Sequence, residues 1–166
     1  ICLELQDGRI SIRRESGVER QRDRRFREFV TKKIRPDVYQ RYSEKTYRQL
    51  YERYDIFIVG SDQVWNPFWA VNRKTARTYF LNFFGEKRKV SYAASIGAGE
   101  IPEEKRDLFR RGLSDFDFLS VREETGAGLV FDLIGRRPEV LPDPTMLLTA
   151  ETWRGLEKCP SHLKEN

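Results

Sequence analysis

The 166-residue chain is about the size of one domain and is long enough to bury a substantial hydrophobic core. Its 39% hydrophobic content, with 11 Phe, 7 Tyr and 3 Trp, excludes a disordered chain, and its two cysteines, Cys2 and Cys159, are too few for a disulfide framework or a cysteine-based zinc site. The net charge of +5 is concentrated in residues 1–54, which hold 15 Lys or Arg and 9 Asp or Glu.

The sequence contains no apolar run long enough to cross a membrane and no signal-peptide pattern. We therefore expect a cytoplasmic protein without an integral membrane span, and peripheral attachment to a membrane stays open. The basic segment Arg20–Arg27 has two interpretations: attraction of nucleic acid or another polyanion, or the solvated face of an amphipathic helix. We favour the helix face and expect no nucleic-acid partner, because no aromatic stacking pattern or nucleic-acid motif accompanies the charge.

The first 53 residues are predicted to form a hairpin followed by helices. Asp7-Gly8 lies between two short alternating segments and is a strong turn signal, so residues 1–20 are expected to contain a β-hairpin. Residues 21–53 are predicted to be helical. The two helices expected there are Phe26–Ile34, stopped by Pro36, and Glu44–Arg53, capped by Ser43.

The segment Ile56–Val59 is the centre of the predicted sheet. It is an unbroken apolar run between a charged residue and a glycine, which is typical of a strand buried on both faces in a parallel sheet. The short polar residues Ser61, Asp62 and Gln63 follow it directly. Polar groups beyond the carboxyl end of such a strand indicate a ligand site, although a simple turn cap is the structural alternative.

Strands and helices are predicted to alternate from residue 54 to residue 158. A loop is expected over 67–78, then a core-facing strand or short helix over 79–84, and an exposed turn over 85–89. The further predicted strands are 90–94, 116–121 and 140–141. The further predicted helices are 102–113, 124–134 with Gly135 as its stop, and a last one capped by Thr149, before a polar tail at 159–166.

This alternation predicts an α/β fold: a Rossmann-like parallel sheet with helices on both faces. Right-handed crossovers bring the carboxyl ends of parallel strands to the same edge, so the polar segments after each strand are expected to converge. These segments are Gly60–Gln63, Ser95–Gly97, Ser120–Glu123 and Asp143–Thr145. Four converging polar strand ends predict a cleft.

Arg122 and Asp62 are the candidate catalytic residues. An arginine just after a buried strand reaches the sheet edge, where its guanidinium can hold a phosphate or a carboxylate with two hydrogen bonds. The structural alternative for Arg122 is a salt bridge to Asp62 or Asp143. The candidate substrate-binding residues are the polar and glycine positions of the same strand ends: Gly60, Ser61, Gln63, Ser95, Gly97, Glu123 and Asp143.

No complete catalytic or cofactor motif occurs in the sequence. There is no GxSxG and no GxxxxGK[ST], and Gly97-Ala98-Gly99 lacks the third glycine of a dinucleotide-binding loop. The only histidine, His162, lies in the predicted tail. We therefore expect no metal and no cofactor.

Four segments, in their order and spacing, resemble the polysaccharide pyruvyl transferase family. The most specific is Tyr54–Asn66, which contains GSDQVWN; VSYAASIG, LSVRE and VLPDPTMLL follow it, with Trp153 beyond. The resemblance covers residues 22–158. It implies one half of a two-domain, glycosyltransferase-B-like architecture. It also implies transfer of a pyruvyl group from phosphoenolpyruvate, the donor substrate, to a sugar of a surface or secreted polysaccharide such as an exopolysaccharide.

The resemblance further implies that Arg122 clamps the anionic groups of the donor and that Asp62 orients an acceptor hydroxyl or holds its loop. The family's first strand and its carboxyl-terminal domain, with an essential histidine, have no counterpart in this sequence. We therefore expect residues 1–158 to be an incomplete amino-terminal domain of a longer parent protein, inactive alone. Its expected partners are phosphoenolpyruvate, a saccharide acceptor and the missing carboxyl-terminal domain.

Two other functions stay open on the sequence. One is a nucleotide-sugar-dependent glycosyltransferase of similar fold. The other is a non-enzymatic interaction domain that uses the basic segment Arg20–Arg27.

Overall fold

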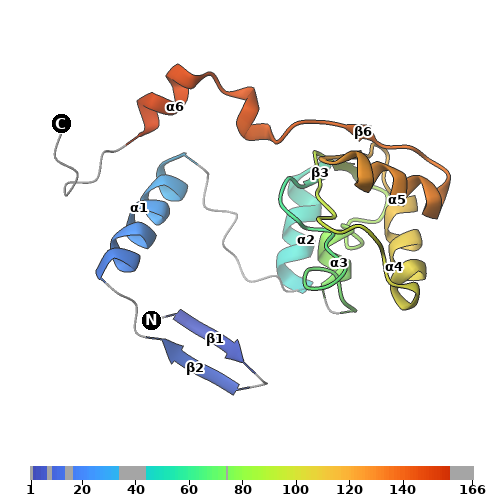
Figure 1. Ribbon diagram of the computed structural model, residues 1–166, viewed down its shortest axis with the longest axis horizontal. Helices are drawn as coiled ribbons and strands as arrows, with labels where there is room; N and C mark the ends of the chain where they lie inside the picture. The colour runs from blue at the N-terminus through green and yellow to red at the C-terminus, as the bar shows by residue number, and fades with distance from the viewer. Residues whose placement is uncertain (1, 7–8, 14–16, 34–43, 74, 158–166) are drawn as a thin grey trace. The chain divides into compact units, whose positions relative to one another are not determined.

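The computed structural model describes residues 2–6, 9–13, 17–33, 44–73 and 75–157 (Figure 1). The chain divides into two compact units, Ile1–Thr46 and Tyr47–Asn166, and each is described by itself. Among the described residues, no helix has the length and apolar character needed to cross a membrane.

The first unit contains the predicted hairpin and a long helix. Strands β1 (Cys2–Gln6) and β2 (Arg9–Arg13) pair antiparallel, with Leu5 opposite Ile10, which confirms the two predicted strands. The predicted turn at Asp7-Gly8 lies outside the described residues. Helix α1 (Gly17–Lys33) begins nine residues before the predicted start at Phe26, so that start was wrong. The extra turns are rich in Arg, Gln and Glu, which favour a helix without producing an apolar stripe.

Four parallel strands form the framework of the second unit. Strand β3 (Ile56–Val59) pairs with β4 (Arg88–Ser91), and β5 (Ser120–Val121) pairs with β6 (Glu139–Val140). Isolated parallel bridges from Val90 to Phe118 and from Ala94 to Val121 join the two pairs. The strands therefore lie side by side in the order β3-β4-β5-β6, which confirms the α/β character. The regular part of β5 is much shorter than the predicted strand 116–121.

The longer helices of the second unit match their predicted positions closely, but the short helix Ala76–Tyr79 lies mostly in the predicted loop 67–78, and residues 80–84 form turns where a strand or short helix was predicted. The helices are α2 (Glu44–Arg53), α3 (Ala76–Tyr79), α4 (Glu103–Ser114), α5 (Glu124–Ile134), the 3-10 turn η2 (Pro144–Leu147) and α6 (Ala150–Leu156). Gly135 ends α5 with a φ of 69°, and its N–H donates to the carbonyl of Phe131. The Thr149 hydroxyl caps α6 by accepting from the N–H of Thr152. Both predicted end signals are confirmed, whereas the predicted tail 159–166 lies outside the described residues.

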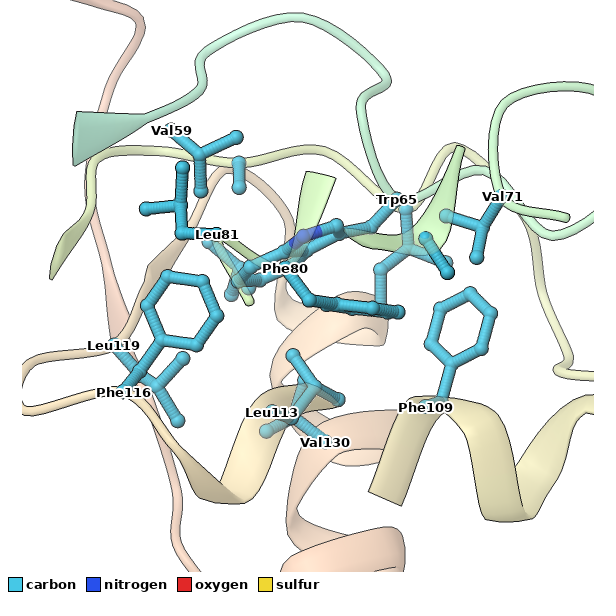
Figure 2. Packing of buried hydrophobic residues seen from close by; sticks show 14 of the residues in the cluster. Val59, Trp65, Val71, Phe80, Leu81, Phe109, Leu113, Phe116, Leu119 and Val130 are labelled. Carbon is cyan, nitrogen blue, oxygen red and sulfur yellow. The ribbon is translucent and has the colours of Figure 1, made fainter. Parts of the chain in front are cut away.

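The core of the second unit is built around the aromatic side chain of Trp65 (Figure 2). Trp65 is fully buried, its ring meets Phe116 edge-on, and its indole N–H donates to the carbonyl of Tyr79 at 3.0 Å. Phe80 lies against Trp65 and meets Phe109 of α4 edge-on. Since the loop after β3 carries Trp65, burial of this ring fixes the path of the polar residues that precede it.

The prediction that Ile56–Val59 is buried on both faces was wrong. Phe57 and Val59 point into the core, but Ile56 and Ile58 are 51% and 65% exposed, and Phe118 farther across the sheet is 44% exposed. The strand order explains this result. When strands follow one another in sequence order, right-handed crossovers place every connecting helix on the same face. The helices that connect these strands, α3, α4 and α5, therefore lie on one face, not on both as the sequence predicted.

The prediction of an exposed turn over 85–89 was wrong for its last two residues, which belong to a strand. Strand β4 begins at Arg88, and the side chain of Lys89 is only 2% exposed. Its ammonium group forms an ion pair with Asp115, which lies just after α4, and its backbone N–H donates to the carboxylate of Asp117. A buried lysine is tolerated here because a carboxylate satisfies its charge.

Two buried serines join β4 to β5 where the backbone ladder between these strands is interrupted. The Ser91 hydroxyl donates to the Ser120 carbonyl at 2.9 Å and accepts from the Ser120 N–H at 2.8 Å. In return, the Ser120 hydroxyl donates to the Ser91 carbonyl at 2.6 Å and accepts from the Ala93 N–H at 2.9 Å. Ser120 is therefore a fully buried structural residue, and its predicted place among the exposed polar strand ends was wrong.

Candidate functional site

The residues after four consecutive strands meet in one hydrogen-bonded network. We call Ser61, Ser95, Arg122, Glu123 and Asp143 the polar rim. Ser61 comes after β3, Ser95 after β4, Arg122 and Glu123 after β5, and Asp143 after β6. The structure thus brings together five of the nine residues that the sequence singled out, at the edge where their convergence was predicted.

Arg122 is the centre of the polar rim. Its Nη1 donates to the Ser61 carbonyl at 3.1 Å and to Asp143 Oδ2 at 3.3 Å, and its Nε donates to Glu123 Oε1 at 3.2 Å. The side chain is 30% exposed. Of the two alternatives open on the sequence, the ion pair with Asp143 is present, and an ion pair with Asp62 does not occur among the described residues. Within that same part of the chain, Nη2 has no partner and its two N–H groups are available to a ligand.

Asp143 is held ionised by its neighbours. The pKa of its carboxyl is lowered, first because the Ser61 hydroxyl donates to Oδ2 at 2.6 Å, and then because the backbone N–H and the hydroxyl of Thr145 donate to Oδ1. Arg122 lowers the pKa further. These bonds also fix the loop, since Asp143 caps the η2 turn that begins at Pro144.

Glu123 connects Arg122 to the strand end of β4. Its Oε1 accepts from the Ser95 hydroxyl at 2.6 Å as well as from Arg122. Its other oxygen, Oε2, is the one buried side-chain polar atom without a hydrogen-bond partner among the described residues, and it faces the start of α5 near Gly126. Glu123 thus orients both Ser95 and Arg122, which makes it a positioning group for the polar rim.

Gly60 lets the loop after β3 pass against the loop after β4. Its φ is 133°, a region that favours glycine, and a Cβ built on it would lie 2.0 Å from the carbonyl oxygen of Tyr92. Asp62 follows two residues later with an exposed side chain, and its Oδ1 accepts from the N–H of Gln63 at 2.7 Å. Asp62 therefore holds its own loop, one of the two roles expected for it, and has no direct bond to Arg122 among the residues described.

Gln63 and Gly97 lie together next to the polar rim. The Gln63 side chain lies over Gly97, where a Cβ would come within 2.5 Å of it. Asn66, which is 4% exposed, donates to Gln63 Oε1 at 3.1 Å and to the Gly97 carbonyl at 3.2 Å. Asn66 is one of the polar residues that follow the same strand but is not among the candidate site residues predicted from the sequence, although its position in GSDQVWN was the available signal. Its amide joins the two loops that carry Ser61 and Ser95.

The charges of the polar rim limit what it can bind. One guanidinium lies between two carboxylates, so Arg122 is already neutralised and has only the Nη2 donors left. A polyvalent anion held there needs further cations from residues outside the rim. Both carboxylate oxygens of Asp143 already accept hydrogen bonds, and the Ser95 hydroxyl is fully buried and donates to Glu123. The exposed carboxylate of Asp62, on the loop of Ser61, is better placed to accept from a hydroxyl group of a sugar.

A comparison with protein families decides which group of proteins has this arrangement. A family model described as polysaccharide pyruvyl transferase matches residues 6–166. The chain belongs to this family. No curated protein and no solved structure matches the chain in the corresponding comparisons. The resemblance seen in GSDQVWN, SVRE and DPTMLL is therefore confirmed, and the family points to a saccharide as the molecule that is modified.

Proposed function

We propose that the chain takes part in the transfer of a pyruvyl group from phosphoenolpyruvate to a sugar of a surface or secreted polysaccharide. The observation that supports this most is the polar rim: four strand ends of a polysaccharide pyruvyl transferase converge on one arginine that keeps two free N–H donors.

In this reaction a sugar hydroxyl loses its proton as its oxygen bonds to C2 of phosphoenolpyruvate, and C3 takes up a proton. A second hydroxyl of the same sugar then loses its proton as it bonds to C2, and the bond from C2 to the phosphate oxygen breaks. The phosphate leaves with the electron pair of that bond and takes up the second proton, so the products are a ketal and inorganic phosphate. The protein has to hold the anionic donor, orient the hydroxyls and supply the proton.

Arg122 is suited to the first task through its Nη2, whose N–H groups can each donate to an oxygen of the donor's carboxylate or phosphate, while Nε and Nη1 hold the guanidinium in place. Asp143 and Glu123 keep the guanidinium in a fixed orientation, so little freedom is lost when a ligand binds. Asp62 contributes an exposed carboxylate on the neighbouring loop, and we assign it to an acceptor hydroxyl.

The remaining cations and the proton donor belong, in this proposal, to another part of a longer parent protein. The described residues contain no histidine, and His162 lies outside them. The isolated chain is accordingly expected to be inactive. The proposal involves no cofactor besides the donor substrate.

The test is to incubate the full-length protein with phosphoenolpyruvate and a panel of oligosaccharides and to analyse the products by mass spectrometry. A saccharide carrying a pyruvyl ketal, formed together with an equal amount of phosphate, supports the proposal. Transfer of a glycosyl group from nucleotide sugars, with no reaction of phosphoenolpyruvate, would overturn it in favour of a glycosyltransferase. Salt-sensitive binding to nucleic acid with neither activity would overturn it in favour of a basic interaction domain.

A further inference from the structure

The loop after β3 displays two adjacent aromatic side chains to solvent. Phe68 and Trp69 are each 61% exposed, although the residues on either side of them are buried. Trp65, Pro67 and Val71 are all less than 2% exposed. The exposure of the pair is therefore a local exception within a packed turn, and not a property of a loose loop.

The backbone of this turn is fixed from several directions. The Asn66 side chain accepts from the N–H of Phe68 at 2.9 Å, and the Asn66 carbonyl accepts from the N–H of Val71 at 2.9 Å. Lys105 of α4 donates to the carbonyls of Pro67 and Val71. A rigid turn that holds two rings out of the core is preorganised, so a ligand that covers the rings does not have to order the loop.

The same turn is tied to the loops that carry the polar rim. Asn66, which holds Phe68, also donates to Gln63 and to the Gly97 carbonyl, and these two residues belong to the loops of Ser61 and Ser95. The turn that carries the aromatic pair is thus anchored to the two loops that carry Ser61 and Ser95.

We propose that Phe68 and Trp69 form a stacking platform for the saccharide acceptor. A pyranose has a face of C–H groups that packs against an aromatic ring, while its hydroxyls bond to polar side chains around it. Exposed rings on the loop that also carries the exposed carboxylate of Asp62 match both parts of such a ligand. The identity of the ligand as the acceptor depends on the proposed function; the saccharide chemistry of the platform does not depend on the donor.

The test begins with binding of the chain, without phosphoenolpyruvate, to an array of oligosaccharides built from hexoses and N-acetylhexosamines. The oligosaccharide that binds best is then titrated by calorimetry into the unsubstituted chain and into each of its variants. Trp69→Ala is expected to weaken binding about tenfold, and Phe68→Ala to weaken it less, while Trp69→Tyr keeps most of the affinity because a flat ring remains. Phe131→Ala, which removes a 49% exposed ring on α5, is the matched control and is expected to leave binding unchanged.

Thermal unfolding should be similar for all these variants, because each side chain removed is largely exposed. The platform is refuted if the array shows no binding, or if Trp69→Ala and Phe131→Ala bind the titrated oligosaccharide equally well. Binding that depends on Trp69 in a protein that does not use phosphoenolpyruvate would keep the platform and reject the proposed donor. Activity of the full-length protein with phosphoenolpyruvate, with a KM for the acceptor that Trp69→Ala leaves unchanged, would support the proposed donor and reject the platform.

Discussion

Replacing Ser120 by alanine should destabilise the second unit strongly, because one hydroxyl satisfies two buried backbone groups. The Ser120 hydroxyl donates to the Ser91 carbonyl at 2.6 Å and accepts from the Ala93 N–H at 2.9 Å. Alanine leaves both groups in a site that water does not reach, since Ser91 and Ser120 are fully buried. Each buried group left without a partner costs about 1–3 kcal/mol, and partial relaxation brings the expected total to about 2–4 kcal/mol.

The control is Ser114→Ala at the end of α4. Ser114 also forms a hydrogen bond to a backbone carbonyl, that of Arg110 at 2.8 Å, but its side chain is exposed. Water replaces this bond in the variant, so the expected change in the free energy of unfolding is below about 0.5 kcal/mol. Both substitutions remove a serine hydroxyl that is hydrogen-bonded to the backbone, and the two sites differ in how deeply that hydroxyl is buried.

Urea denaturation followed by circular dichroism measures both variants, with the slope m checked for a change in the compactness of either state. At about 3–5 °C for each kcal/mol, Ser120→Ala is also expected to lower Tm by about 6–20 °C. If Ser120→Ala is no more destabilising than Ser114→Ala, the hydrogen bonds of the Ser91 and Ser120 hydroxyls do not hold β4 and β5 together. The positions of Ser95 and Arg122 would then need another explanation.

Two further substitutions test the loops around the polar rim. Gly60→Ala should lower the free energy of unfolding by about 2–5 kcal/mol, because alanine disfavours the φ at this position and its Cβ would overlap the Tyr92 carbonyl. The control is Gly99→Ala, where a Cβ meets nothing within 4 Å, and it should lower the free energy of unfolding by less than about 1 kcal/mol. Equal urea midpoints for the two variants would contradict the close approach at Gly60. Folding lowers the pKa of the Asp143 carboxyl. The carboxylate therefore contributes to the free energy of unfolding above the unfolded-state pKa of about 4, and this contribution is lost as the pH falls below that value. The difference in the free energy of unfolding between the unsubstituted protein and Asp143→Asn should therefore be largest near neutral pH and shrink on acidification. A difference that stays constant over this pH range would contradict the prediction.

Much of the secondary structure could be predicted from short-range signals. The bounds of α2 and α5 follow from apolar periodicity and from end signals such as Gly135, and the strand at Ile56–Val59 follows from its apolar run. What the local pattern did not give was the environment. A run of four apolar residues is the same whether one face or both are covered, and the strand order that leaves Ile58 exposed is a long-range property.

The candidate site was predictable because the topology of the sheet determines which residues meet there. Parallel strands end at one edge, so the polar residues after them had to meet, and Arg122 with Asp143 does so. The sequence did not distinguish a serine at the edge from one inside the sheet. Ser95 and Ser120 are both fully buried, yet only Ser120 lies within a strand, where its hydroxyl replaces missing ladder bonds, whereas the Ser95 hydroxyl donates to Glu123. Nor did it show that two carboxylates would neutralise Arg122.

The central claim is that Arg122 holds the anionic donor, and steady-state kinetics of the full-length protein with phosphoenolpyruvate test it most directly. Relative to the unsubstituted full-length protein, Arg122→Ala should lower kcat/KM for phosphoenolpyruvate by about 30- to 1,000-fold. This loss is equivalent to about 2–4 kcal/mol of transition-state stabilisation. Arg111→Ala, the loss of an exposed arginine on α4, should leave it unchanged. A loss below about threefold in folded Arg122→Ala would contradict the claim and leave Arg122 a structural residue of the polar rim.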